Sequence, residues 1–182
     1  VRPIEPVFLD FKKDMSQLTA KSDIPVLYKQ NTTNDLFQLI YVFDMGNNND
    51  KALGTAFDYL EYLGTSDMTP EELKSEFYRL ACTFYVSPGN ERTYVVLSGL
   101  NENMPAAMQL FEKLLADAQV NKEAYNNLVG DILKARADAK LNQGQNFSRL
   151  MNYAMYGPKS PATNLLTEAE LASMNPQKLV DR

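Results

Sequence analysis

Histidine and tryptophan are both absent from this 182-residue chain, and cysteine occurs once. Without histidine the chain lacks the imidazole ligands of catalytic zinc sites and the base that activates most serine and cysteine nucleophiles. The single Cys82 excludes an intramolecular disulfide and a thiolate zinc site, and its apolar neighbours predict a buried, unreactive thiol. These absences exclude the common zinc and triad chemistries for the chain on its own.

Positive charge and long apolar runs are also scarce. Lysine and arginine total 18 against 23 acidic residues, and the net charge of −5 argues against nucleic acid, which favours basic patches. No apolar run is long enough for membrane insertion. Because the chain starts at Val1 rather than Met, we expect a piece of a longer protein. Its compartment is left open between the cell envelope or periplasm and the cytoplasm.

The composition is globular, with 45% hydrophobic and 23% charged residues, and the opening has two prolines within six residues. We therefore predict a linker over residues 1–10 and a single domain over 11–182.

Four strands are predicted, arranged as two hairpins. The first hairpin joins 24–29 to 36–45 and the second joins 83–86 to 93–100. In the predicted strand 36–45, every second residue is apolar, which places five apolar side chains on one face. The five are Phe37, Leu39, Tyr41, Phe43 and Met45. The opposite face carries Gln38, Ile40 and Val42 and is expected to be partly covered.

Helices are predicted between and after these hairpins. Asn49 or Asp50 is expected to cap a helix ending near Leu63, and Thr69-Pro70-Glu71-Glu72 is a capping box that starts the next. Further amphipathic helices are expected over 105–117, from 121 onwards, over 146–155 and after 167. This order predicts an α+β fold, an antiparallel sheet covered on one side by helices.

Few side chains have the spacing of a catalytic or metal site. Asp58 and Glu61 lie three residues apart on one helix face, a spacing that favours a solvated face over a magnesium or calcium pair. A self-contained enzyme that uses carboxylates stays open at this point, because nothing singles out one pair among the 23 acidic residues.

Residues 54–65, GTAFDYLEYLGT, have the outline of a known metallopeptidase helix, G-x-A-H-x-x-E-H followed by G-T. This stretch resembles the pitrilysin/insulinase-type zinc metallopeptidase family, the inverzincins, which include the mitochondrial-processing-peptidase-like proteins. Aligning the two outlines puts Phe57 and Glu61 at the histidine ligands and Leu60 at the catalytic glutamate. The resemblance therefore implies a domain without catalytic residues or metal ligands of its own.

Further segments resemble the family in the same order and extend the likeness from Pro25 to Leu179. They are Thr69–Leu73, Thr83–Val86, Glu91–Val95, Leu100–Leu115 and Met155–Gly157. The family's third ligand, a distal glutamate, would fall in the helix after Asn121. Glu123 and Asp131 are the nearest acids there, and neither is assigned as a ligand because both histidines are missing.

The resemblance implies a mitochondrial-processing-peptidase-like metallohydrolase fold and a non-catalytic domain cut from a longer chain. Such a domain would pack against a catalytic domain of the same chain or a partner subunit and help form a peptide-binding chamber, with zinc held by that partner. Peptide substrate in the family adds as a strand to a sheet edge, here expected at Thr83, Phe84, Tyr85 and Val86. The alternative is an interaction or scaffold subunit of a heteromeric assembly with no proteolytic role.

Overall fold

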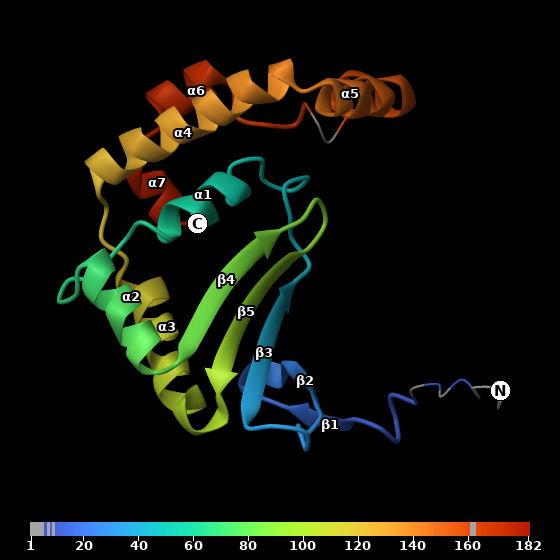
Figure 1. The fold of residues 1–182 in the computed structure, drawn as a ribbon, viewed down its shortest axis with the longest axis vertical. Coiled ribbons are helices and arrows are strands. Elements are labelled where there is room, and N and C mark those ends of the chain that lie inside the picture. The colour runs from blue at the N-terminus through green and yellow to red at the C-terminus, as the bar shows by residue number, and fades with distance from the viewer. Residues whose placement is uncertain (1–5, 7, 9, 161–162) are drawn as a thin grey trace. The chain divides into compact units, whose positions relative to one another are not determined.

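The computed structural model describes residues 6, 8, 10–160 and 163–182, within two compact units that divide between Leu36 and Phe37 (Figure 1). Most of the predicted linker over 1–10 lies outside the described residues. The boundary between that linker and a single domain over 11–182 stays a prediction.

The first unit contains a hairpin of β1 (Ser16–Thr19) and β2 (Pro25–Tyr28), joined through the 3-10 turn η1 (Lys21–Asp23). Strand β1 was not predicted, and the predicted pairing of 24–29 with 36–45 is wrong because β2 pairs with β1. The side chains of the connecting segment explain the difference. Asn31 Nδ2 donates to Leu36 O, and Leu36 N donates to Asn34 Oδ1, so these asparagines organise their own loop instead of a hairpin turn.

The second unit is built on a three-stranded antiparallel sheet with the order β3-β5-β4. Its strands are β3 (Leu36–Phe43), β4 (Cys82–Pro88) and β5 (Thr93–Leu100), and β4 and β5 form the predicted hairpin. Cys82 lies opposite Gly99, where a Cβ atom would come within 2.4 Å of the Cys82 Sγ. The Cys82 thiol is buried, as predicted, and burial raises its pKa.

Two helices cover one face of this sheet. The predicted capping box starts α2 (Pro70–Arg79), which contacts β4, and α3 (Met104–Asp117) follows the 3-10 turn η2 (Asn101–Asn103) and contacts β5. The resulting core combines residues of both helices with residues of the sheet: Leu73, Phe77, Leu97, Ala107, Leu110, Phe111 and Leu114. The predicted α+β fold, with helices on one side of an antiparallel sheet, is confirmed.

The opposite face of the sheet is more open than predicted. Ile40 and Val42 are 47% and 53% exposed, because α2 and α3 pack against the other face. Phe37, Leu39 and Tyr41 point toward the core as expected. Phe43 and Met45 are also exposed, since they lie at the end of β3 and beyond it.

A second core lies between α1 (Leu53–Leu60), α4 (Lys122–Leu141), α6 (Glu168–Ser173) and α7 (Gln177–Val180). Helix α1 begins after Ala52 without a side-chain cap, so the predicted caps are wrong. Asn49 Oδ1 instead accepts from Gly46 N, and Asp50 Oδ1 accepts from Ala52 N. Helix α5 (Gln143–Tyr156) follows α4 and leads into the 3-10 turn η3 (Gly157–Lys159), beyond both cores (Figure 1). No helix in the described part of the chain has the length and apolarity to cross a membrane.

Candidate functional site

The positions that resemble a zinc motif lie on α1 and at its C-cap, and α1 contributes side chains to both cores. Leu60 is buried in the sheet core, and Phe57 packs half-buried against the same cluster. Glu61 is exposed and follows the last residue of α1. Two hydrocarbon side chains and one carboxylate do not fit zinc, which takes nitrogen, sulfur or oxygen ligands. Of the three positions that resemble the motif, Leu60 and Phe57 therefore pack in or against the sheet core, and Glu61 is exposed.

The acidic residues near this helix do not complete a metal site. The pKa of Asp58 is raised, first by loss of water around its carboxylate and second by repulsion from Glu61. Within the described ranges, no group of three or more histidine, cysteine, aspartate or glutamate side chains is arranged to hold a metal ion. Glu123 and Asp131 are both exposed on α4.

Glycines on either side of α1 are required by close backbone approach. Gly46 starts a loop whose Asn47 N donates to Gly89 O at 2.9 Å, and a Cβ on Gly46 would lie 2.5 Å from that oxygen. After the helix, a Cβ on Gly64 would lie 2.3 Å from Met68 O. Close approach of the Met68 carbonyl therefore explains why glycine is required at position 64, which is also part of the family-like outline.

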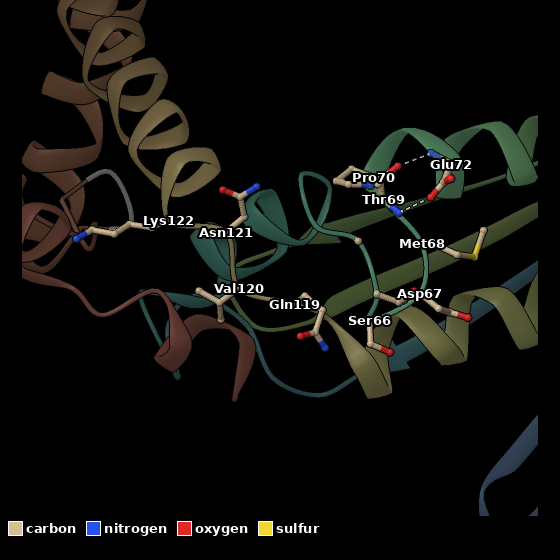
Figure 2. Close-up of a pocket in the computed structure, with 12 residues that line it drawn as sticks. Ser66, Asp67, Met68, Thr69, Pro70, Glu72, Gln119, Val120, Asn121 and Lys122 are labelled. Carbon is tan, nitrogen blue, oxygen red and sulfur yellow. Dashed lines mark hydrogen bonds between the residues drawn. The ribbon is translucent and has the colours of Figure 1, made fainter.

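The loop after α1 forms one wall of a surface pocket of about 570 Å³ (Figure 2). Residues 64–70 and Glu72 line one side, and residues 119–122 line the other. Thr69 and Glu72 are joined by the two hydrogen bonds of the capping box, while Lys122 extends away from them. The pocket thus lies between the starts of α2 and α4.

Asp67, which lines this pocket, and Asp117 beside it are both held by neighbouring side chains. Lys113 Nζ lies 2.5 Å from Asp67 Oδ2, and this hydrogen bond followed by that of Thr65 lowers the pKa of Asp67. Ser66 donates through both its hydroxyl and its backbone N–H to Asp117, which lowers the pKa of Asp117. Both carboxylates therefore stay ionised near neutral pH and fasten the loop to α3, an arrangement that suits neither a general acid nor a nucleophile.

Predicted peptide contacts fall on β4, which lies at one edge of the three-stranded sheet. Phe84 faces the core, with its ring centroid 5.1 Å from Phe77 and 4.9 Å from Phe111. Val86 also packs against the core, whereas Thr83 and Tyr85 are exposed. Peptide contact at these four positions stays a prediction. Among the four, Thr83 and Tyr85 are the exposed side chains.

Several structural residues near the site were not predicted from the sequence. Ser66 and Asp117 are 51 positions apart, so their contact has no local signal. No role was predicted for Tyr59, yet its hydroxyl bonds to the backbone of Asn121.

Solved structures share this fold, although no protein-family model and no curated protein sequence matches the chain. The periplasmic protease PqqL from Escherichia coli aligns with a TM-score of 0.76 and 15% identity, over 95% of this chain and 20% of its own. A peptidase M16 inactive domain from Pseudomonas fluorescens aligns with a TM-score of 0.77 and 15% identity, over 91% and 42%. The ferredoxin protease FusC, in complex with Arabidopsis ferredoxin, aligns with a TM-score of 0.76 and 12% identity, over 100% and 22%.

This chain therefore shares its fold with two proteases and with a peptidase M16 inactive domain, which confirms the predicted resemblance to a peptidase family at the level of the fold. One of the three similar structures is an inactive domain. The chain spans between about a fifth and two fifths of the length of these proteins.

Proposed function

We propose that this chain is a non-catalytic domain of a zinc metallopeptidase, which packs against a catalytic domain and helps to form the peptide-binding chamber. Two of the three motif positions hold apolar side chains in place of a zinc ligand and the catalytic glutamate. This observation carries the proposal. Leu60 lies in the sheet core and Phe57 packs against it, and the sequence resemblance aligns these two positions with the family's catalytic glutamate and one of its ligands. Zinc is assigned to the partner catalytic domain, because the donor set on α1 does not fit it.

A contribution to the chamber is proposed for the edge strand β4. The unpaired backbone groups of an edge strand can hydrogen-bond an extended peptide, and outward side chains can add selectivity. Thr83 and Tyr85 are the outward side chains of the predicted segment. FusC, a structural neighbour, is a protease in complex with a protein, ferredoxin, which supports a binding role for this type of fold.

The proposal is tested in the full-length product of the gene by measuring zinc content and peptide hydrolysis with and without residues 37–182. We expect zinc to remain bound to the catalytic domain and hydrolysis to fall at least about tenfold, equivalent to about 1.4 kcal/mol of transition-state stabilisation. A full-length protein that binds no zinc and hydrolyses no peptide would contradict the proposal and favour the scaffold alternative.

A point substitution tests the role of the β4 edge without the risk that a deletion variant misfolds. Tyr85→Asp on β4 is compared with Tyr78→Asp on α2, since both tyrosines are exposed. We expect Tyr85→Asp to lower kcat/KM about fivefold or more, mainly through KM, and Tyr78→Asp to stay within about twofold. Equal effects of the two substitutions would contradict a role for the β4 edge.

A further inference from the structure

Strand β4 has a free edge that its sequence does not protect against pairing. It is the last strand in the order β3-β5-β4, and within the described part of the chain no strand pairs with its free side. Natural proteins commonly protect such edges with lysine or another charged residue. None of the seven residues of β4 is charged, and only Pro88, at its end, lacks an N–H to donate. The composition of β4 therefore suits the addition of another strand.

The outward face of this edge carries no charge. Phe84 and Val86 point to the sheet core, so the alternate residues of β4 point to the opposite face, where each is exposed: Thr83, Tyr85 and Ser87. The neighbouring strands also present uncharged side chains on this face, in a chain in which 23% of residues are charged. They are Gln38, Ile40 and Val42 of β3 and Tyr94, Val96 and Ser98 of β5. On this face an added strand would therefore lie beside uncharged side chains.

Strand β5 shows which side chains fit beside those of β4. Its outward residues lie opposite the outward residues of β4, in the pairs Tyr94 with Ser87, Val96 with Tyr85 and Ser98 with Thr83. Val96 is only 4% exposed beside Tyr85. An aromatic residue opposite a β-branched one, and two hydroxyl residues opposite each other, are favourable pairs across antiparallel strands. A strand added to the free side of β4 would meet the same three outward side chains.

A peptide suits this edge better than a second copy of the chain. Tyr85 is the one large exposed side chain of β4 and leaves on the order of 100 Å² uncovered, whereas stable protein interfaces begin near 1,200 Å² in total, roughly. Each copy also has a net charge of −5, so two copies would bring like charges together. An added peptide instead gains affinity from main-chain hydrogen bonds along the strand.

We infer that the β4 edge binds an extended peptide segment that is uncharged at alternate positions. The position opposite Tyr85 takes a β-branched or aromatic residue, and the position opposite Thr83 takes serine or threonine. The residues between them point to the core side of the sheet, where α1 and α2 contact β4. The binding role of β4 rests on the proposed function, to which this alternating uncharged pattern adds the class of peptide.

Three fluorescent peptides with identical flanking residues test this pattern by anisotropy with the 182-residue chain. The first has tyrosine, valine and serine at alternate positions with alanine between them, in the order of the outward residues of β5. The second has the same composition with these three residues consecutive, which moves valine to the other face. The third has lysine in place of valine. We expect the first peptide to bind at least about threefold more tightly than the second and the third.

Tyr85→Thr locates the site, because threonine keeps a strand-forming residue while removing the aromatic ring. Tyr78→Thr on α2 is the matched control, since Tyr78 is also exposed. We expect the preference to fall below about 1.5-fold in Tyr85→Thr and to persist in Tyr78→Thr, with thermal midpoints that show both variants to be folded. Equal affinity for the three peptides, no binding at about 1 mM, or a preference that survives Tyr85→Thr would overturn the inference. Tighter binding of the lysine peptide would also overturn it, since general attraction to an acidic chain would then explain binding.

Two further measurements separate the alternatives. Sedimentation of the 182-residue chain detects a second copy, and a dimer that Tyr85→Thr dissociates would contradict a peptide site at this edge. Zinc-dependent peptide hydrolysis is measured with the full-length product of the gene. Hydrolysis without the peptide preference contradicts the alternating pattern alone, whereas the preference without hydrolysis contradicts the proposed function alone.

Discussion

The Tyr59 hydroxyl donates to Asn121 O at 2.7 Å and accepts from Asn121 N at 2.9 Å. Asn121 is the N-cap of α4, so this pair fastens the helix that resembles a zinc motif to the helix that would carry the third ligand in a peptidase. The Tyr59 ring also meets Tyr125 edge-on, with centroids 5.6 Å apart. Tyr59 therefore packs into the second core and Leu60 packs into the sheet core, so two sides of α1 are used for packing.

Tyr59→Phe tests this attachment. Removing the hydroxyl leaves the Asn121 N–H without its partner, while the Asn121 carbonyl keeps its bond from Tyr125 N, so we expect the free energy of unfolding to fall by about 1–3 kcal/mol. Urea unfolding measures the change. Tyr78→Phe is the control, since its 87% exposed side chain should change stability by less than about 0.5 kcal/mol. Equal losses for the two variants would show that the hydroxyl pair is unimportant.

Gly64→Ala and Gly130→Ala should have opposite effects on stability. A Cβ on Gly64 would meet Met68 O at 2.3 Å, so the loop must shift and we expect a loss of about 1–3 kcal/mol. Gly130 lies within α4, and a Cβ added there would have nothing within 4 Å, so alanine should gain about 0.5–1 kcal/mol through helix propensity. Thermal and urea unfolding of both variants check the signs.

Introducing the family's motif residues at Leu60 and Glu61 should lower the free energy of unfolding more at the buried position than at the exposed one. Leu60→Glu places a carboxylate in the sheet core, and we expect a loss of about 2–5 kcal/mol. Glu61→His changes an exposed position and should stay within about 0.5 kcal/mol. Circular dichroism during urea unfolding distinguishes the two. A Leu60→Glu variant as stable as the parent chain would contradict the packing role assigned to this position.

Acid should weaken the contact between α6 and the start of α1. Lys51 Nζ lies 2.5 Å from Glu170 Oε1, and this bond, followed by those from Thr167, lowers the Glu170 pKa from 4.5 to about 2. Because the folded pKa lies below the unfolded one, the stabilisation is present above about pH 4.5 and is lost as pH falls toward 2.

Glu170→Gln should therefore lower the urea midpoint at pH 6 and have progressively less effect as the pH approaches 2. Added salt should reduce the difference, since the pair is accessible to solvent. Glu168→Gln, in the same helix, is the matched control. A difference between Glu170→Gln and the parent chain that is independent of pH would contradict the ion-pair explanation.

Local signals in the sequence predicted the elements of the second unit well. The capping box at Thr69, the proline at the start of α3 and the turn between β4 and β5 each depend on neighbouring residues, so each could be recognised directly. The order of these elements then carried the resemblance to a peptidase fold. Confirmation of that fold came from the three-dimensional comparison, because identities of 12–15% leave little sequence signal.

Long-range pairing could not be predicted in the same way. The partner of β2 depends on β1, a strand with the polar sequence SQLT that has no alternation to mark it. The link between Ser66 and Asp117 and the exposure of Phe147 and Leu150 on α5 are likewise set by tertiary arrangement. An amphipathic pattern such as that of α5 predicts a buried face but does not identify the surface that covers it.

Zinc content and peptide hydrolysis of the purified 182-residue chain test the central claim most directly, with the full-length product of the gene as the comparison. We predict that the 182-residue chain binds no stoichiometric zinc and hydrolyses no peptide, while the full-length protein binds zinc and hydrolyses peptide in a zinc-dependent reaction. One zinc per 182-residue chain together with zinc-dependent turnover would contradict the assignment of this chain as a non-catalytic peptidase domain.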